Sequence, residues 1–122
     1  MTTFADLPAT QPAGTAVCHV ADLHPDRGAA ALVEGRQVAL FRLAGSDEVL
    51  AVSHRDPFTG ANVIARGLVG SRGDAVTVAS PLLKQVFDLR TGQCLDDPDV
   101  ALATYPVHVV DDVVHVVVDE TG

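Results

Sequence analysis

Residues 79–95 read ASPLLKQVFDLRTGQCL. Pro81 follows Ser80 in a short loop, SPLL, and the apolar runs QVFDL and QCL then flank the turn residues RTG. Two short apolar runs on either side of a turn that contains Gly are typical of an antiparallel β-hairpin. The stretch therefore predicts a loop that leads into a hairpin.

The same alternation of short apolar runs and turn residues extends over the whole chain. AALV at 30–33 and RQVALFRL at 36–43 flank a two-residue turn at Glu34 and Gly35, and EVLAVS follows. The chain contains twenty valines, whose branching at Cβ suits a pleated sheet and stiffens the side chain in a helix. No sustained helical period or internal repeat occurs. We predict an all-β fold, an antiparallel β-sandwich or small barrel.

The last apolar stretch, YPVHVVDDVVHVVVD, predicts a hairpin whose register can be stated. If Asp111 and Asp112 form its turn, alternation places five valines on one face, which we expect to be the core face. His108 and His115 then lie opposite each other on the other face. A metal site needs three or four ligands, so we interpret these residues as two partly exposed histidines and place no metal there. The five valines are Val107, Val109, Val114, Val116 and Val118.

Length and charge narrow the function classes. The chain has 122 residues, enough for a single domain. We assign 1–15 to a flexible N-terminal tail, 16–119 to the domain and 120–122 to a short C-terminal tail. The net charge is −8 with a pI near 4.7, so a nucleic-acid backbone would be repelled. Residues 55–90 are the exception, with five basic residues against three acidic ones.

The chain shows no sign of secretion or membrane insertion. No run reaches the roughly 18 apolar residues of a membrane helix, and the first fifteen residues lack the basic start and apolar block of a signal peptide. We therefore expect a cytoplasmic location. Cys18 and Cys94 are far apart and have no metal-binding spacing, so we expect reduced thiols, with Cys18 a small buried residue rather than a nucleophile.

The two loops at 56–58 and 80–83 invite comparison with a Rieske centre. Such a centre holds a [2Fe-2S] cluster through a CxH loop and a CxxH loop, because one iron takes two thiolates and the other two imidazoles. Here DPF and SPLL have the corresponding spacing, so the ligand places are Asp56, Phe58, Ser80 and Leu83. Phe and Leu offer no lone pair, and two oxygen atoms do not suit a site that prefers thiolate and imidazole. We predict no cluster on this chain.

The loss of the ligands leaves two interpretations of Phe58 and Leu83. In the first, the two side chains pack against each other where the cluster would lie and keep the loops closed, each contributing roughly 1.5 to 3 kcal/mol if fully buried. In the second, they are exposed and form a docking patch for a partner protein. Alanine at both positions lowers the melting temperature in the first case and weakens complex formation in the second.

Three long segments resemble one family. DPFTGANVIARGLVGSRG, VASPLLKQVFDLRTGQCLDDP and YPVHVVDDVVHV are similar to the small subunit of assimilatory NAD(P)H-dependent nitrite reductase, the NirD type, over about residues 16–118. The resemblance implies a Rieske-like fold without a cluster, a domain without catalytic residues, and a large subunit that carries FAD, a [4Fe-4S] cluster and sirohaem and reduces nitrite to ammonia. Leu83 departs from the larger polar or aromatic residue expected before Lys84.

The sequence is therefore compatible with three functions. The first is a non-catalytic nitrite reductase subunit, bound to its partner through the loop end, where we name Asp56, Phe58, Ser80, Leu83 and Lys84. The second is a Rieske-type electron-transfer ferredoxin, and the third is a free-standing interaction module on the same fold. The sequence does not decide between NADH and NADPH as the donor.

Overall fold

The computed structural model describes residues 14–118, and ten strands account for most of the regular structure in that range. Two 3₁₀ turns, η2 (Val20–Asp22) and η3 (Ile64–Arg66), are the helical elements of this part of the chain. No helix among the described residues is long and apolar enough to cross a membrane. The predicted tails fall almost wholly outside the described residues, although β1 already begins at Thr15. The strands are β1 (Thr15–His19), β2 (Gly28–Val33), β3 (Arg36–Arg42), β4 (Val49–Ser53), β5 (Leu68–Arg72), β6 (Ala75–Ala79), β7 (Val86–Asp88), β8 (Thr104–Tyr105), β9 (Val107–Val110) and β10 (Val113–Val116).

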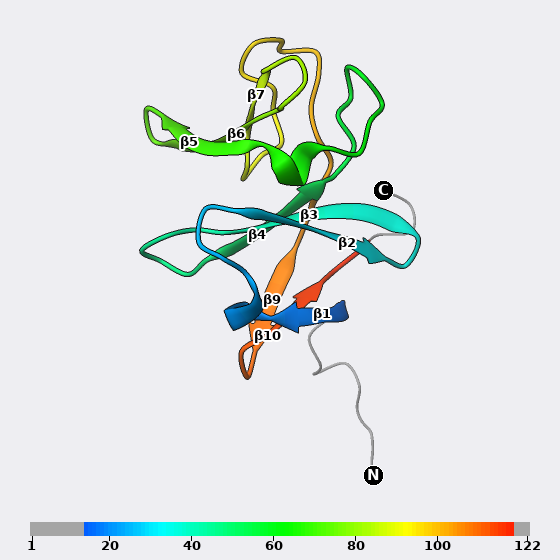
Figure 1. Ribbon diagram of the computed structural model, residues 1–122, viewed down its shortest axis with the longest axis vertical. Helices are drawn as coiled ribbons and strands as arrows, with labels where there is room; N and C mark the ends of the chain where they lie inside the picture. The colour runs from blue at the N-terminus through cyan, green and yellow to red at the C-terminus, as the bar shows by residue number, and fades with distance from the viewer. Residues whose placement is uncertain (1–13, 119–122) are drawn as a thin grey trace.

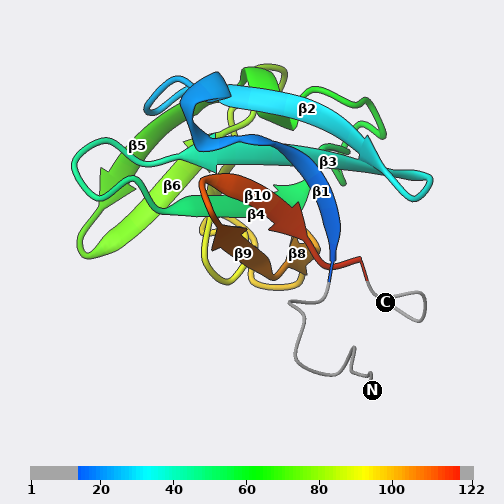
Figure 2. The same ribbon diagram turned by 90° about the horizontal axis from the view of Figure 1, so that it is seen from below.

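The strands form three antiparallel sheets that lie one above another. The orders are β1-β10-β9, β2-β3-β4-β8 and β5-β6-β7. Figure 1 shows β5 to β7 above the central sheet and β1, β9 and β10 below it, and Figure 2, seen from below, shows β10 in front of β4 with β9 beside it. The all-β antiparallel architecture predicted from the sequence is confirmed.

The central sheet has a core on each face. Along β3, Ala39 and Phe41 belong to the core beneath β5–β7, whereas Val38 and Leu40 belong to the core shared with β1 and β10. Successive side chains of a strand point to opposite faces, so a sheet that is covered on both sides needs an unbroken apolar run. This is why residues 38–41 are buried without interruption.

Both predicted two-residue turns are present. Glu34 and Gly35 have φ of 48° and 84°, and Asp111 and Asp112 have φ of 53° and 66°. Positive φ at both central residues matches the twist of the flanking strands, which is the reason such turns close tight hairpins. The predicted register of the last hairpin is confirmed, including the pairing of His108 with His115.

One residue of the predicted core face is not buried. Val114 and Val116 are fully buried, and Val107 and Val118 pack partly against the same core. Val109, however, is 46% exposed. The prediction for Val109 is wrong because β9 is an edge strand of its sheet. Only β10 lies beside it, so the side chain of Val109 is less covered than those on β10.

The two cysteines are unpaired thiols, as predicted. Cys94 is buried in the upper core, and Cys18 packs partly against the lower one. Burial raises the pKa of the Cys18 thiol, and the negative charge of Asp22 raises it further. Cys18 is thus half-buried rather than buried as expected, and a thiol that resists ionisation is a poor nucleophile.

Candidate functional site: two loops without cluster ligands

The two loops adopt the same turn. In the first, the Asp56 N–H donates to the Ala61 carbonyl (2.8 Å) and the Gly60 N–H donates to the Asp56 carbonyl (2.7 Å). In the second, the Ser80 N–H donates to the Gln85 carbonyl (2.9 Å) and the Lys84 N–H donates to the Ser80 carbonyl (3.0 Å). The RTG turn has the same pair of hydrogen bonds: the Asp88 N–H donates to the Gln93 carbonyl (2.8 Å), and the Gly92 N–H donates to the Asp88 carbonyl (2.7 Å). Three turns of one kind therefore set the shape of this end of the molecule.

Asp56 and Ser80 join the two loops directly. The Ser80 hydroxyl donates to Asp56 Oδ2 across 2.5 Å, and Asp56 Oδ1 accepts hydrogen bonds from the N–H groups of Phe58 (2.8 Å) and Thr59 (3.4 Å). Ser80 Oγ also accepts a hydrogen bond from the N–H of Leu82 (3.4 Å). Both residues are almost fully inaccessible, 0% and 1% exposed. The two places that thiolates would take are thus occupied by a hydrogen-bonded pair that closes the loops.

This contact escaped prediction from the sequence. The spacing of the two loops predicts Asp56 and Ser80 as lost ligands, but not as partners of each other. A signal was available, because each stands directly before a proline, and Asp and Ser side chains readily accept hydrogen bonds from backbone N–H groups two residues further on. The hydrogen bond between them depends on the folding of the two loops against each other, so neither loop's sequence alone predicts it.

The structure separates Phe58 from Leu83. Phe58 is half-buried against the upper core, with its ring centroid 6.3 Å from that of Phe87 and the ring planes tilted by 48°. Leu83 is 54% exposed. The expectation that both are buried against each other is wrong for Leu83, because residues 81–84 form the outer part of the turn and face solvent.

The outer part of the second loop forms an exposed apolar tip. Leu82 is 49% exposed next to Leu83, and both precede the exposed Lys84. Lys84 has φ of 65°, in the left-handed region where a residue with a Cβ is strained by about 1 to 2 kcal/mol. The corresponding positions of the other two turns are glycines, Gly60 and Gly92. We call Leu82, Leu83 and Lys84 the loop tip.

The residues present do not fit a [2Fe-2S] cluster. Phe58 and Leu83 have only carbon in their side chains, and the oxygen atoms of Asp56 and Ser80 bond to each other. A Rieske cluster needs two thiolates and two imidazoles. Across residues 14–118 there is also no group of three or more His, Cys, Asp and Glu side chains suited to a metal ion.

A buried histidine supports the first loop. His54 lies at the end of β4, and its Nδ1 accepts a hydrogen bond from the Ala65 N–H (3.1 Å). Burial lowers the pKa of the His54 imidazole, and the charge of Arg66 lowers it further. The sequence alone assigned no role to His54. Its role in the structure is to hold η3 against the loop.

His54 makes stability depend on pH. The folded protein disfavours the protonated ring, whereas the unfolded chain takes up a proton near the ordinary pKa of 6.5. Stability is therefore complete above that value and is lost as the pH falls below it, until the lowered folded pKa is reached. Between pH 7.5 and 5.5 we expect urea denaturation to show that the free energy of unfolding falls, because the unfolded chain takes up this proton before the folded protein does.

The His54→Asn variant tests this assignment, because the amide oxygen can accept the same hydrogen bond but does not titrate. We expect it to lack that component of the pH dependence. His24→Asn, at an exposed histidine, is expected to retain it. Equal pH dependence in wild type and His54→Asn would assign the effect to another group.

Gln85 is a second residue that the sequence did not single out. Its Oε1 atom is buried and accepts no hydrogen bond within the described part of the chain. An unsatisfied buried acceptor is uncommon in folded proteins.

Comparison with known proteins agrees with these features. The family model for the Rieske-like [2Fe-2S] domain matches residues 14–117. The chain is 43% identical over 98 residues to the nitrite reductase (NADH) small subunit of Salmonella typhimurium, covering 80% of this chain and 91% of that protein. The solution NMR structure of the nitrite reductase [NAD(P)H] small subunit from Erwinia carotovora superimposes with a TM-score of 0.77 at 39% identity, covering 89% of this chain and 84% of that one.

A third similarity is to a much longer protein. The nitrite reductase [NAD(P)H] large subunit of Klebsiella oxytoca is 38% identical to this chain over 94 residues. The match covers 77% of this chain but only 10% of that protein. A domain of this kind is thus part of the same polypeptide as that large subunit.

Proposed function

Because the chain belongs to the family of Rieske-like [2Fe-2S] domains and, within it, to the small subunits of NAD(P)H-dependent nitrite reductase, we propose that it is a non-catalytic subunit bound to a separate large subunit. The large subunit carries FAD, a [4Fe-4S] cluster and sirohaem, and reduces nitrite to ammonia in the cytoplasm. This chain supplies no cofactor of its own and supports the large subunit by binding to it.

The observation that carries this proposal is the similarity to part of the Klebsiella oxytoca large subunit. When one polypeptide joins two units that other organisms make separately, the units need to remain close to each other. A covalent link supplies that proximity in one protein, and a binding surface supplies it in the other. The proposed partner of this chain is accordingly the large subunit.

The loop tip is the proposed main contact. Leu82 and Leu83 expose apolar side chains next to each other, and exposed apolar clusters mark protein interfaces. Asp56, Phe58 and Ser80 lie beneath the tip and hold its shape rather than touching the partner, since Asp56 and Ser80 are inaccessible and Phe58 packs inward.

Electron transfer through this chain is disfavoured by its donor set. A ferredoxin of the Rieske kind moves electrons through its cluster, and the four ligand places hold Asp, Phe, Ser and Leu. No described residue replaces the missing redox group with a pair of neighbouring thiols, because Cys18 and Cys94 lie in different cores. The proposal therefore assigns the redox steps to the large subunit.

Substitution of the loop tip tests the proposal. We expect Leu82→Asp together with Leu83→Asp to weaken binding to the purified large subunit at least tenfold, because two charges would have to be buried at the contact. The melting temperature should stay within about 2 °C, since surface changes rarely alter stability by more than about 0.5 kcal/mol. Binding is measured by surface plasmon resonance.

Leu32→Asp serves as the control. Leu32 is 67% exposed on β2, outside the loops, and its substitution should leave the affinity unchanged. Failure of the wild-type chain to bind the large subunit at all would refute the proposed function. Normal binding by the loop-tip variant would instead move the contact elsewhere on the domain.

A further inference from the structure

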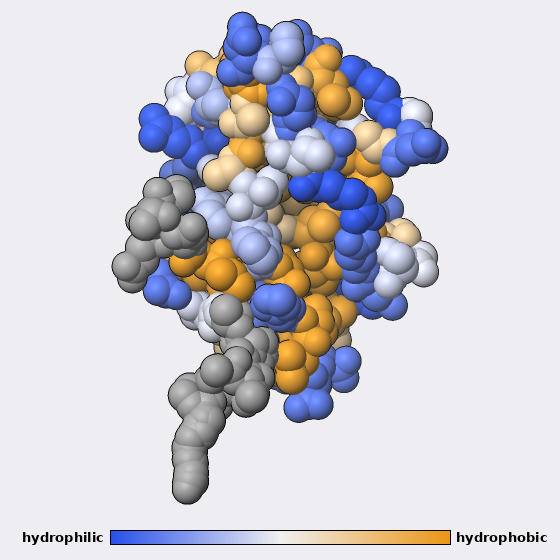
Figure 3. All heavy atoms as spheres, turned by 180° about the vertical axis from the view of Figure 1, so that it is seen from behind, coloured by the Kyte–Doolittle hydropathy of each residue, from blue (hydrophilic) through white to orange (hydrophobic). Residues whose placement is uncertain are grey.

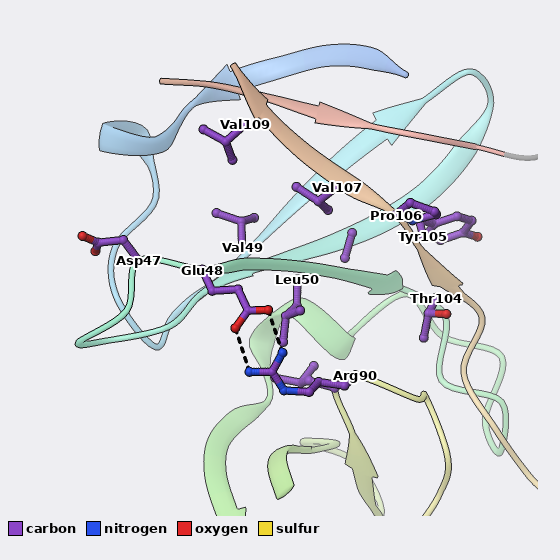
Figure 4. Close-up of a pocket in the computed structure, with 12 residues that line it drawn as sticks. Asp47, Glu48, Val49, Leu50, Arg90, Thr104, Tyr105, Pro106, Val107 and Val109 are labelled. Atoms are coloured by element: carbon purple, nitrogen blue, oxygen red, sulfur yellow. Dashed lines mark hydrogen bonds and ion pairs between the residues drawn. The ribbon is translucent and has the colours of Figure 1, made fainter. Parts of the chain in front are cut away.

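The lower half of the molecule has a second surface that the loop end does not explain. A cleft of about 430 Å³ lies between β4 and β9 and is lined by Val49, Leu50, Val107 and Val109, among others. Figure 4 shows the valines of β9 and β4 facing the same space, with the Glu48–Arg90 pair at one side. On the face seen in Figure 3, apolar atoms gather in the lower half above a group of hydrophilic ones.

The cleft forms because the chain leaves β4 at Pro106. Residues 104 and 105 pair with β4, and residues 107–110 then pair with β10 instead. Proline has no N–H to continue a ladder, so the change of partner occurs where a hydrogen bond would be missing anyway. Beyond this point β4 and β9 diverge, and β9 is the edge strand of its sheet.

The register shows which backbone groups of β9 are free. The two-residue turn makes Val110 and Val113 a hydrogen-bonded pair, and pairs alternate along an antiparallel ladder. The Val117 N–H donates to the Pro106 carbonyl (2.9 Å), which agrees with this alternation. The N–H and C=O groups of Val107 and Val109 therefore point away from β10. An extended segment could pair with them as an added strand.

The surroundings of this edge are acidic. A second hollow, of about 720 Å³, shares Val109 with the cleft and is lined by Asp22, Asp47 and Asp112. Arg42 pairs with Asp47 (2.8 Å), and Arg90 with Glu48, which lowers the pKa of the glutamate. Among the residues that the structure describes, Asp22, Asp111 and Asp112 near the turn after β9 make no ion pair with a basic side chain. A segment that lies here gains from a Lys or Arg at the end next to that turn.

We propose that the edge of β9 at Val107 and Val109 binds an extended segment of the large subunit as an added strand, with apolar side chains over the cleft and a basic residue facing Asp111 and Asp112. This inference rests on the proposed function, which supplies the partner. The added strand would cover the exposed side chains of Val109 and Val110, 46% and 39% exposed. The loop tip and the β9 edge are then two separate contacts with one protein.

A proline substitution tests the backbone contact. Val109→Pro removes an N–H that β10 does not use, so the hairpin keeps its own hydrogen bonds. We expect this variant to bind the large subunit at least tenfold more weakly. Leu32→Pro is the matched control: Leu32 is exposed on the edge strand β2, and its position next to the Val33–Arg36 pair gives it an equally free N–H.

Amide hydrogen exchange gives a second measurement on the wild-type protein. In the free chain the amides of Val107 and Val109 should exchange rapidly, while those of His108 and Val110 are protected by β10. In the complex, Val107 and Val109 should become protected. Rapid exchange that persists in the complex, or equal binding by Val109→Pro and Leu32→Pro, would overturn the inference and leave the loop-tip contact intact.

The remaining outcome concerns a different occupant. If Val107 and Val109 become protected with rising concentration of this chain alone, and sedimentation shows a dimer, the edge pairs with a second copy. That result would overturn the assignment to the large subunit. If the wild-type chain does not bind the large subunit at all, the proposed function is refuted. That result differs from a complex that forms without the β9 edge contact.

Discussion

Replacing Asp56 with alanine is expected to lower the free energy of unfolding by about 3 kcal/mol, because it leaves buried hydrogen-bond donors without an acceptor. The Phe58 N–H and the Ser80 hydroxyl both donate to this carboxyl group, and a buried polar group without a partner costs about 1 to 3 kcal/mol. For a domain of this size the melting temperature should fall by roughly 15 °C. Urea denaturation and calorimetry measure the two quantities.

Two variants separate the hydrogen bonds from the charge. In Asp56→Asn the amide oxygen can accept from Phe58 and the amide nitrogen can donate to Ser80, so the loss should stay below about 1 kcal/mol. Asp74→Ala removes a negative charge from the exposed β5–β6 turn and should change stability by less than about 0.5 kcal/mol. If Asp56→Ala is as stable as Asp74→Ala, the pair does not hold the loops together.

Gly92→Ala is expected to lower the free energy of unfolding by about as much as Asp56→Ala, because of the backbone conformation at residue 92. Gly92 has φ of 80°, and an added Cβ would lie 2.1 Å from the carbonyl oxygen of Leu102. The left-handed conformation costs a non-glycine residue about 1 to 2 kcal/mol, and crowding in a packed region adds about 1 to 3 kcal/mol. The Leu102 N–H also donates to the Gly92 carbonyl (2.7 Å), so moving Leu102 strains that bond. We expect a loss of about 3 kcal/mol by urea denaturation.

Gly35→Ala distinguishes strain from crowding. Gly35 has φ of 84°, but an added Cβ there would meet no atom within 4 Å. Its substitution should therefore cost about 1 kcal/mol, the conformational part alone. Equal losses for the two variants would show that Leu102 yields easily, and that the turn at 88–92 is not tightly packed against residues 102–104.

The sequence predicted those parts of the fold that depend on local rules. The turns at Glu34–Gly35 and Asp111–Asp112 are given by residue type and by spacing, and the register of the last hairpin follows from its turn. Val109 was assigned to the core by alternation alone. Alternation states which face a side chain is on, but it does not state whether another strand covers it, and at Val109 on the edge strand β9 none does.

The site was predictable in position but not in its contacts. The loops and their residues followed from spacing and from resemblance, and Phe58 proved to pack inward as one of the two interpretations required. Leu83 lies outward because residue 83 is at the outer side of a turn whose base is fixed by Ser80 and Gln85. The bond between Asp56 and Ser80 joins residues 24 positions apart, and spacing within one loop carries no information about the other.

The account depends most on the claim that the Asp56–Ser80 pair replaces the cluster as the link between the loops. Its most direct test is anaerobic purification, followed by incubation with ferrous iron and sulfide, removal of unbound ions and electron paramagnetic resonance after reduction. We expect no two-iron signal, and no more iron or acid-labile sulfide than in a sample of serum albumin treated in the same way. A stoichiometric two-iron, two-sulfide centre bound to this chain would contradict it.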